Sequence, residues 1–496
     1  MNRAKQVLLG NAAMTIILGF ALSAQAQSVY SRVERVKYLT QQVRGQGLMP
    51  QWYLSGNTEL QVQNLIAAGQ TAQADVELKK ITTRIAKDLY SGRVSPEKMQ
   101  AKAKIAEKKF IHASAVDQFL SEQLTVEQLL ATVVPKHRSY SEALQTYQRL
   151  LVMQENSQWA QRPAGLKTAK LQLNIKNPAL VQYLRQKLND YGYQNKVTQP
   201  LFDSELDAAV RQFQQDHNLK ADGIVGDISW SFLDRPLEQL ITQAIINLDR
   251  TRWLPDDLSN QYIVVNLAQQ RLQLFQNDQM TMDFQTINGR LDRQTPMLID
   301  QVRSVVLNPT WTVPVSIFMK DKLPELRKDP GYIARNNMQI VDDVTGATID
   351  PYLVDWNKDP SQYNRYTIVQ RPGPWNALGF IKFPLANPYA IYLHDTNDRS
   401  LFSQSQRLFS SGCVRVAQPF ELAEKILNTP EWSTDSLKNA TEYLPMVAEK
   451  PTNLKPGKRT AVYLFYKTLF QESDGRIVSL NDHYGTDKLM YSMMGN

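Results

Sequence analysis

The spacing of apolar side chains changes near residue 255 of this 496-residue chain. Upstream, segments such as 72–89 and 135–152 place apolar and aromatic side chains three or four positions apart, which predicts amphipathic helices. Downstream, residues 263–267 and 272–275 are strand-like apolar runs separated by a short polar turn, which predicts a hairpin. Two such different patterns favour separate domains, so we expect a multidomain chain whose C-terminal part is mostly β.

The first residues have the pattern of a signal peptide. Arg3 and Lys5 precede an apolar core, and residues 24–26 form an Ala-Gln-Ala cleavage pattern. We therefore expect export to the periplasm or cell envelope; an uncleaved N-terminal anchor, the alternative, would leave the protein in the same compartment. The remaining length predicts two to four domains. The predicted regions are a signal peptide (1–26), a helical scaffold (27–165), a small three-helix domain (166–240), a linker (241–260) and a mostly-β domain (261–496) interrupted at about 317–370.

The only cysteine of the chain, Cys413, follows one of its five histidines, His394, by 19 positions. The thiolate is the attacking form of cysteine, so a catalytic cysteine needs a neighbouring base or cation, and His394 is the candidate base. Because exported proteins usually pair their cysteines, a solitary thiol in such a chain favours a chemical use for it. The alternative is an inert, buried Cys413 and an ordinary core or surface histidine.

The residues around this pair predict how it is held. Residues 391–394 alternate as in a strand, which places Tyr392 and His394 on one face. In the Ser-Gly-Cys sequence, glycine allows a sharp turn, and the backbone amides of Ser411 and Gly412 are candidates for an oxyanion hole. We therefore predict that the histidine ends a strand at a cleft.

The sequence His-Asp-Thr at 394–396, followed by Ser-Ser-Gly-Cys-Val-Arg at 410–415, resembles the signature of the L,D-transpeptidases with a YkuD-type catalytic domain. These are cysteine enzymes that cross-link peptidoglycan stem peptides, and the likeness extends from about residue 261 to the C-terminus. The commonest family form has histidine immediately before the glycine, where this chain has Ser411. Serine can serve there if that position contributes only its backbone amide. Segments that agree with the large multidomain branch of the family are 294–296, 308–314 and 373–383.

The resemblance implies acyl transfer by a cysteine. Cys413 would attack the carbonyl between the third and fourth residues of a tetrapeptide donor stem, and His394 would move the protons. D-Ala would leave, and a diaminopimelate amine of an acceptor stem would attack the thioester to form a 3→3 cross-link. Arg415 and Arg407 are candidates for binding a stem carboxylate, although a structural salt bridge is the alternative for Arg415. Further predicted substrate-binding residues are Ser410, Tyr392, Trp375 and Asn376.

Residues 176–237 resemble a small three-helix peptidoglycan-binding domain. Two apolar helical stripes, within 180–188 and 202–213, precede an Asp-Gly-x-x-Gly turn at 222–226 and Trp230. The alternative is that these residues only pack a helical hairpin. Residues 315–371 are rich in charge and proline, and a connection of this length is usually a lid, a binding loop or disordered. Because the resemblance implies an insertion that caps the groove, we predict a mobile lid at about 317–370.

The sequence lacks zinc-type cysteine pairs, a GxxxxGK[ST] loop and a nucleic-acid module, so we expect no metal, no other cofactor and no nucleic-acid partner. A net charge of +8 favours wall polymers or at most peripheral contact with membrane headgroups, with ordinary solubility as the alternative. The expected partners are peptidoglycan stem peptides, and other wall-synthesis enzymes are further candidates.

Two rival functions remain open. If water instead of an amine attacked the thioester, the same site would act as an L,D-carboxypeptidase. An inactive wall-binding scaffold is favoured by the helical N-terminal half and by Ser411. Only an active cysteine predicts an adduct with a carbapenem, a cysteine-directed β-lactam.

Overall fold

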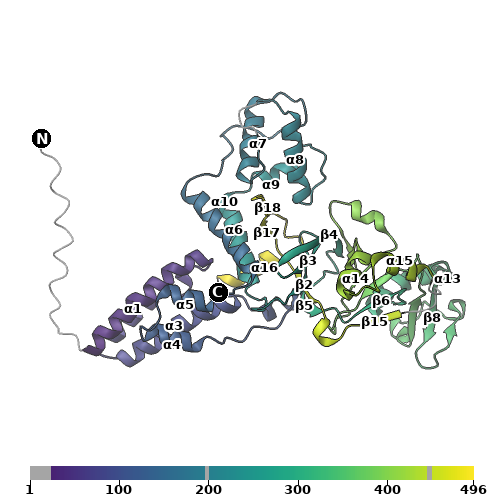
Figure 1. The fold of residues 1–496 in the computed structure, drawn as a ribbon, viewed down its shortest axis with the longest axis horizontal. Helices are drawn as coiled ribbons and strands as arrows, with labels where there is room; N and C mark the ends of the chain where they lie inside the picture. Colours follow the sequence, from purple (N-terminus) through teal and green to yellow (C-terminus); the bar gives the residue numbers. More distant parts are fainter. Residues whose placement is uncertain (1–23, 196–199, 444–449, 496) are drawn as a thin grey trace. The chain divides into compact units, whose positions relative to one another are not determined.

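The computed structural model describes residues 24–195, 200–443 and 450–495, which form two compact units (Figure 1). The first unit holds the described residues up to Arg93 together with Lys109–Pro135, and the second holds Val94–Lys108 and the described residues from Lys136 onward. Most of the predicted signal peptide lies outside the described residues. Within the described ranges, no helix is both long and apolar enough to cross a membrane.

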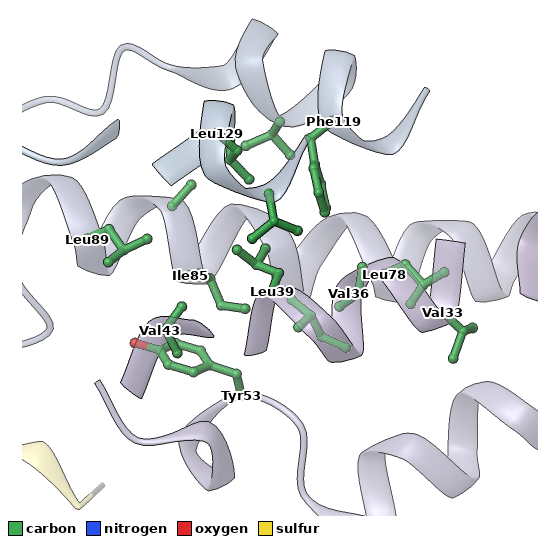
Figure 2. Packing of buried hydrophobic residues seen from close by; sticks show 14 of the residues in the cluster. Val33, Val36, Leu39, Val43, Tyr53, Leu78, Ile85, Leu89, Phe119 and Leu129 are labelled. Carbon is green, nitrogen blue, oxygen red and sulfur yellow. The ribbon is translucent and has the colours of Figure 1, made fainter. Parts of the chain in front are cut away.

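The first unit is a helical bundle built around α3 (Thr71–Ser91), which confirms the helix predicted at 72–89. Leu78, Ile85 and Leu89 of α3 are buried, and Figure 2 shows them among apolar side chains that include Leu39 and Phe119. Burying each such side chain contributes roughly 1.5–3 kcal/mol, which favours this helical arrangement. The other elements of the unit are α1 (Ala24–Gln42), η1 (Val43–Gln46), η2 (Pro50–Trp52), α2 (Gly56–Ala67), α4 (Ala113–Leu120) and α5 (Val126–Val133).

The predicted three-helix domain consists of α7 (Pro178–Asp190), α8 (Ser204–Asp216) and α9 (Asp227–Leu233). Phe213 and Trp230 are buried between these helices. They therefore pack the helices together, which is the role that the sequence left open as the alternative to peptidoglycan binding. His217, at the end of α8, accepts a hydrogen bond at Nε2 from the amide of Ser479, 3.3 Å away. This contact joins the helical domain to the C-terminal tail.

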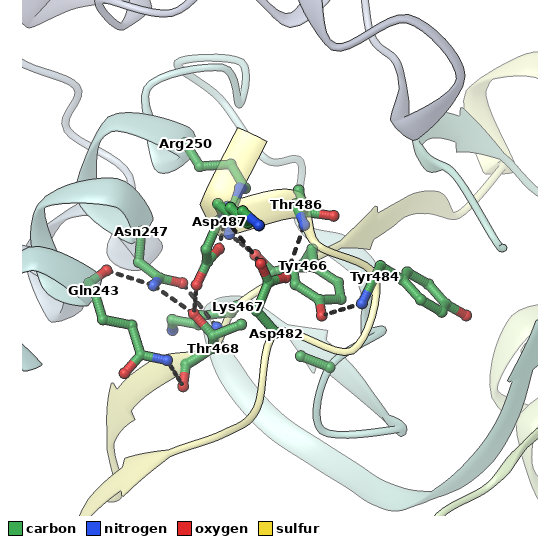
Figure 3. A network of polar contacts seen from close by, with 12 residues as sticks. Gln243, Asn247, Arg250, Tyr466, Lys467, Thr468, Asp482, Tyr484, Thr486 and Asp487 are labelled. Carbon is green, nitrogen blue, oxygen red and sulfur yellow. Dashed lines mark hydrogen bonds and ion pairs between the residues drawn. The ribbon is translucent and has the colours of Figure 1, made fainter. Parts of the chain in front are cut away.

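The prediction of a linker at 241–260 is wrong, because most of that range lies in a buried helix, α10 (Leu237–Thr251). Its charges are paired: Arg250 contacts Asp487 of α16 (Thr486–Met494) at 2.5 Å, and Asp487 also accepts from the Thr468 hydroxyl (Figure 3). Arg250 and Asp487 are therefore buried as an ion pair inside the second unit. Helix α6 (Arg138–Glu155) lies against α10 in the second unit, so the predicted scaffold at 27–165 is divided between the units.

The C-terminal domain is organised around one continuous mixed sheet, which confirms a mostly-β fold. The hairpin predicted at 263–275 is present. The apolar runs at 460–466 and 477–480, on either side of an Asp-Gly turn, also predict an antiparallel pair, and this prediction is wrong. Residues 461–465 instead lie between two other strands of the main sheet, and 477–479 pair with 469–471. In order across the sheet the strands are β1 (Ala103–Lys104), β5 (Met297–Gln301), β16 (Ala461–Phe465), β2 (Gln261–Asn266), β3 (Arg271–Gln276), β4 (Gln279–Gly289), β14 (Val414–Val416), β12 (Leu393–His394), β11 (Ile381–Phe383), β6 (Ser304–Leu307) and β15 (Lys450–Asn453), with β13 (Leu408–Ser410) also pairing with β4. Outside this sheet lie β17 (Leu469–Gln471), β18 (Ile477–Ser479), η3 (Pro96–Lys102), η7 (Arg399–Ser403), α14 (Pro419–Leu427), α15 (Thr434–Tyr443) and η8 (Pro456–Lys458).

The segment that interrupts the β pattern folds around a hydrophobic core of its own, which includes Phe318, Leu326, Ile340, Trp356 and Ile368. The predicted lid therefore has a sheet and a core of its own, and its mobility stays a prediction. Its strands, in sheet order, are β7 (Trp311–Thr312), β10 (Tyr366–Gln370), β8 (Met338–Asp342) and β9 (Thr348–Ile349). Its helices are α11 (Val315–Ile317), η4 (Phe318–Lys322), α12 (Leu323–Lys328), α13 (Tyr332–Arg335), η5 (Pro351–Leu353) and η6 (Pro360–Tyr363).

Candidate active site

Three neighbouring strands hold the predicted site. In the parallel pair β12–β14, Leu393 lies opposite Val414 and His394 opposite Arg415. In the antiparallel pair β11–β12, Lys382 lies opposite His394. Residues opposite one another in a ladder share a face of the sheet, so Lys382, His394 and Arg415 project from one face. Leu393 and Val414 are fully buried on the other face.

Cys413 directly precedes β14, and the amide of Val414 donates to the carbonyl of Tyr392 at 3.1 Å, which extends the pairing by one residue. Cys413 therefore stands beside Tyr392, on the face that carries His394. Strand spacing places the Cα atoms of Cys413 and His394 about 8 Å apart, a gap that a thiol and an imidazole can bridge. The thiol donates to the carbonyl of Ala390 at 3.4 Å, and within the described residues no hydrogen bond joins it to His394.

Electrostatics keeps both partners neutral in the resting site. Burial raises the pKa of Cys413 to about 11, opposed by hydrogen bonds from the amide and hydroxyl of Tyr392 and by the charges of Lys382 and Arg415. Burial, together with the charge of Arg415, lowers the pKa of His394 to about 3. A thiol and an imidazole, rather than an ion pair, are thus favoured at neutral pH. His394 would therefore accept the proton during attack instead of ionising the sulfur beforehand.

The turn that presents the cysteine is closed by Ser410. Gly412 adopts a φ of 122°, which L side chains rarely adopt and which confirms the need for glycine in this turn. The buried Ser410 hydroxyl accepts from the Gly412 amide at 3.1 Å and donates to the Cys413 carbonyl at 2.5 Å. Ser410 thus holds the loop rather than facing a substrate. The Gly412 amide must leave Ser410 before it can serve as an oxyanion donor.

This constellation lies within a segment that matches a known family. Residues 260–463 match the model of the L,D-transpeptidase catalytic domain. This part of the chain is similar to the L,D-transpeptidase catalytic domain. Residues 177–233 match a provisionally assigned peptidoglycan binding domain, and residues 22–146 match a scaffold domain. The multidomain architecture predicted from the sequence is thereby confirmed.

A protein of Haemophilus influenzae that is provisionally named an L,D-transpeptidase is 34% identical to this chain over 258 residues. That stretch is 52% of this chain and 50% of the relative, so the chain spans about half the length of the curated relative it matches. Solved L,D-transpeptidases from Xylanimonas cellulosilytica and Stackebrandtia nassauensis cover 60% and 62% of this chain, and the alignments span 99% and 97% of those proteins. Their sequence identities are 15% and 12%, with TM-scores of 0.19 and 0.24.

Two of the predicted substrate-binding side chains also hold the main chain of this region. Asn376 is fully buried, and its side-chain amide donates to the backbone carbonyls of Pro309 and Arg371. Arg407 is also buried and donates to backbone carbonyls, including that of Gln404 at 2.8 Å. These polar groups satisfy main-chain carbonyls of the domain, and Arg407 also lines a surface pocket with Gln404 and Arg271, so both substrate-binding roles stay predictions. A sequence shows that a side chain can donate hydrogen bonds, but it does not show whether backbone carbonyls already accept them.

The remaining predicted residues keep an open role. Trp375 is 37% exposed. The ring centroid of Tyr392 lies 5.5 Å from that of His394 and 4.5 Å from the ammonium nitrogen of Lys382. Arg415 donates to the Thr396 hydroxyl at 3.4 Å, and in the described part of the chain it forms no ion pair, so the structural salt bridge that was the alternative to substrate binding is not seen there. Sequence reasoning missed Lys382, because strand pairing between distant segments brings it to the site.

Metal ligands are a separate question for this domain. In the part of the chain that the structure describes, His, Cys, Asp and Glu side chains form no group of three or more that could hold a metal ion.

The neutral resting pair predicts a specific pH dependence. We expect the rate of Cys413 alkylation by iodoacetamide, followed by intact mass, to rise about tenfold per pH unit between pH 6 and 9, because the thiolate fraction grows in that way well below the pKa of the thiol. Lys382→Met, which removes a nearby positive charge, should slow alkylation at every pH, whereas Lys425→Met, at an exposed position of α14, should not. A rate that is constant across this range would show a preformed thiolate and contradict the neutral pair.

Proposed function

We propose that this chain is a peptidoglycan L,D-transpeptidase that forms 3→3 cross-links through a thioester on Cys413. The observation that supports this most is the position of the only cysteine beside Tyr392 and on the same sheet face as His394, within a segment matched to that catalytic domain. Nδ1 of His394 is buried, and among the described residues it has no hydrogen-bond partner. A ring nitrogen without a partner is available to take part in proton transfer.

In the proposed first step, the thiol proton moves to His394 as the sulfur bonds to the carbonyl carbon between the third and fourth residues of a tetrapeptide stem. The tetrahedral intermediate collapses, the peptide C–N bond breaks, and D-Ala leaves with the proton from His394. An amine on diaminopimelate of a second stem then attacks the thioester. A new C–N bond forms, the C–S bond breaks, and the amine proton returns to sulfur through His394.

Two cations favour an anionic substrate at this site. Lys382 and Arg415 lie on either side of His394 in the sheet, and among the described residues neither forms an ion pair. A partly buried charge without an ion-pair partner is unfavourable, so a carboxylate of the stem peptide would be stabilised between them. The same charges make the thiolate less costly, because both lower the pKa of Cys413.

The other regions of the chain support the same proposal. The peptidoglycan binding match at 177–233 favours the wall polymer as the partner of the helical domain. The signal-peptide pattern at 1–26 favours the periplasm, where that polymer is found.

Product analysis with purified wild-type protein and disaccharide-tetrapeptides tests the proposal. We expect a cross-linked dimer with a 3→3 bond and one D-Ala released per cross-link, identified by liquid chromatography and tandem mass spectrometry. Tripeptide with free D-Ala and no dimer would favour the carboxypeptidase. Unchanged substrate would favour the wall-binding scaffold, which is the second candidate because of Ser411.

A further inference from the structure

Ser411 stands where the family signature commonly has histidine, and its side chain is held by an arginine. Nη1 of Arg293 donates to the Ser411 hydroxyl oxygen at 3.1 Å. The same guanidinium forms a two-point ion pair with Asp321, in which Nη1 lies 2.5 Å from Oδ2 and Nη2 lies 2.6 Å from Oδ1. Asp321 belongs to η4 of the inserted segment. One guanidinium therefore contacts both the insertion and the nucleophile loop.

The strength of this link comes from its geometry and burial. A two-point arginine–carboxylate contact is among the strongest polar interactions in proteins and fixes the orientation of both groups. The Arg293 side chain is only 12% exposed. The hydrogen bond from Arg293 also lowers the pKa of Asp321, so both groups are charged at neutral pH. Such a pair holds its geometry better than an ion pair between two freely solvated side chains.

The restraint acts close to the sulfur. Ser411 lies between Ser410, which closes the turn, and Gly412, whose amide Ser410 binds. On the other side, the hydrophobic core of the insertion packs against Tyr392, which hydrogen-bonds to the sulfur of Cys413. The insertion thus contacts the surroundings of the nucleophile at two separate places.

We propose that Arg293 is a positioning residue that couples the insertion to the nucleophile loop through Ser411. With Asp321 in place, the guanidinium fixes Ser411 and with it the backbone that presents Cys413. When the insertion withdraws Asp321, Arg293 loses its anchor and the loop loosens. The kinetic part of the test rests on the proposed function, whereas the exchange part does not.

Hydrogen exchange of the full chain tests the coupling without any substrate. In Asp321→Asn we expect the amides of residues 408–416 to exchange at least about threefold faster than in the wild type, because their restraint is weakened. The matched control is Asp329→Asn, which breaks the ion pair with Arg335 in the same insertion but does not contact the loop. Unchanged exchange at 408–416 in Asp321→Asn, or equal acceleration in both variants, would overturn the proposal.

The kinetics of acylation by a carbapenem distinguish a misplaced nucleophile from a general loss of folded structure. We expect Arg293→Gln and Asp321→Asn each to lower kinact about tenfold with KI within about twofold of the wild type, because misplacement of an attacking atom affects the chemical step. The variant that combines Arg293→Gln with Asp321→Asn should have the same kinact as Arg293→Gln alone. When Ser411→Ala is already present, adding Asp321→Asn should lower kinact no further. Independent, additive losses of kinact would contradict the coupling. Alkylation by iodoacetamide, which needs no oxyanion hole, should stay within about threefold of the wild-type rate. A wild-type protein that is alkylated but never acylated would refute the proposed function, and hydrogen exchange would still decide the coupling.

Discussion

The Cys413→Ala variant is expected to form no covalent adduct with a carbapenem, whereas the wild-type protein gains the mass of one molecule. In the wild type, sulfur adds to the β-lactam carbonyl, the ring C–N bond breaks, and the ring nitrogen takes the proton. Because the chain has no second cysteine, no other thiol can replace it. We expect at least about a thousandfold loss of transpeptidation, since the covalent intermediate itself is removed.

Cys413→Ser is the informative companion, because its hydroxyl is much less acidic than a thiol and should be almost as inactive. The adduct in the wild type should map to the peptide that contains Cys413. Thermal unfolding of the three proteins checks that they fold alike. Undiminished 3→3 cross-linking by Cys413→Ala would exclude the cysteine mechanism and leave the chemistry to other residues.

For the His394→Gln variant we expect an acylation rate at pH 7 about a thousandfold below that of the wild type, within the range typical for loss of a general base. Glutamine is polar and of similar size, but it cannot take the proton from a thiol whose pKa is about 11. His483→Gln, which changes a histidine of the C-terminal tail, should keep wild-type acylation. Stopped-flow or quenched mass measurements give the rates.

The pH dependence strengthens this test. Near pH 10 hydroxide begins to supply the thiolate directly, so the gap between His394→Gln and the wild type should narrow. A gap that is equally wide at pH 7 and pH 10, or a loss smaller than tenfold at pH 7, would remove His394 from the role of base.

Local patterns explain how much of this site could be predicted from the sequence. Strand alternation places Tyr392 and His394 on one face whatever strand lies beside them, and a turn that needs a positive φ selects Gly412. Both features depend only on nearby residues. The neutral state of Cys413 could not be predicted in this way, because it depends on burial by segments that are distant in sequence.

Non-local contacts account for what the sequence missed. Lys382 and Arg293 are ordinary charged residues until strand pairing and the insertion bring them to Cys413 and Ser411. The predicted linker failed for the same reason, since the partner of Arg250 is Asp487 in the last helix, 237 residues further along the chain. A charged residue in a sequence does not reveal whether it is solvated or paired in the interior.

The place of β16 in the sheet determines when the domain can assemble. This strand, near the end of the chain, lies between β2, which opens the domain, and β5. While the chain emerges from the ribosome, the facing edges of β2 and β5 therefore remain without their shared neighbour, and unpaired edges of this kind are prone to aggregation. A polypeptide that ends before residue 461 would contain Cys413 and His394 yet lack the strand that joins β2 to β5, so each of these two strands would keep an unpaired edge.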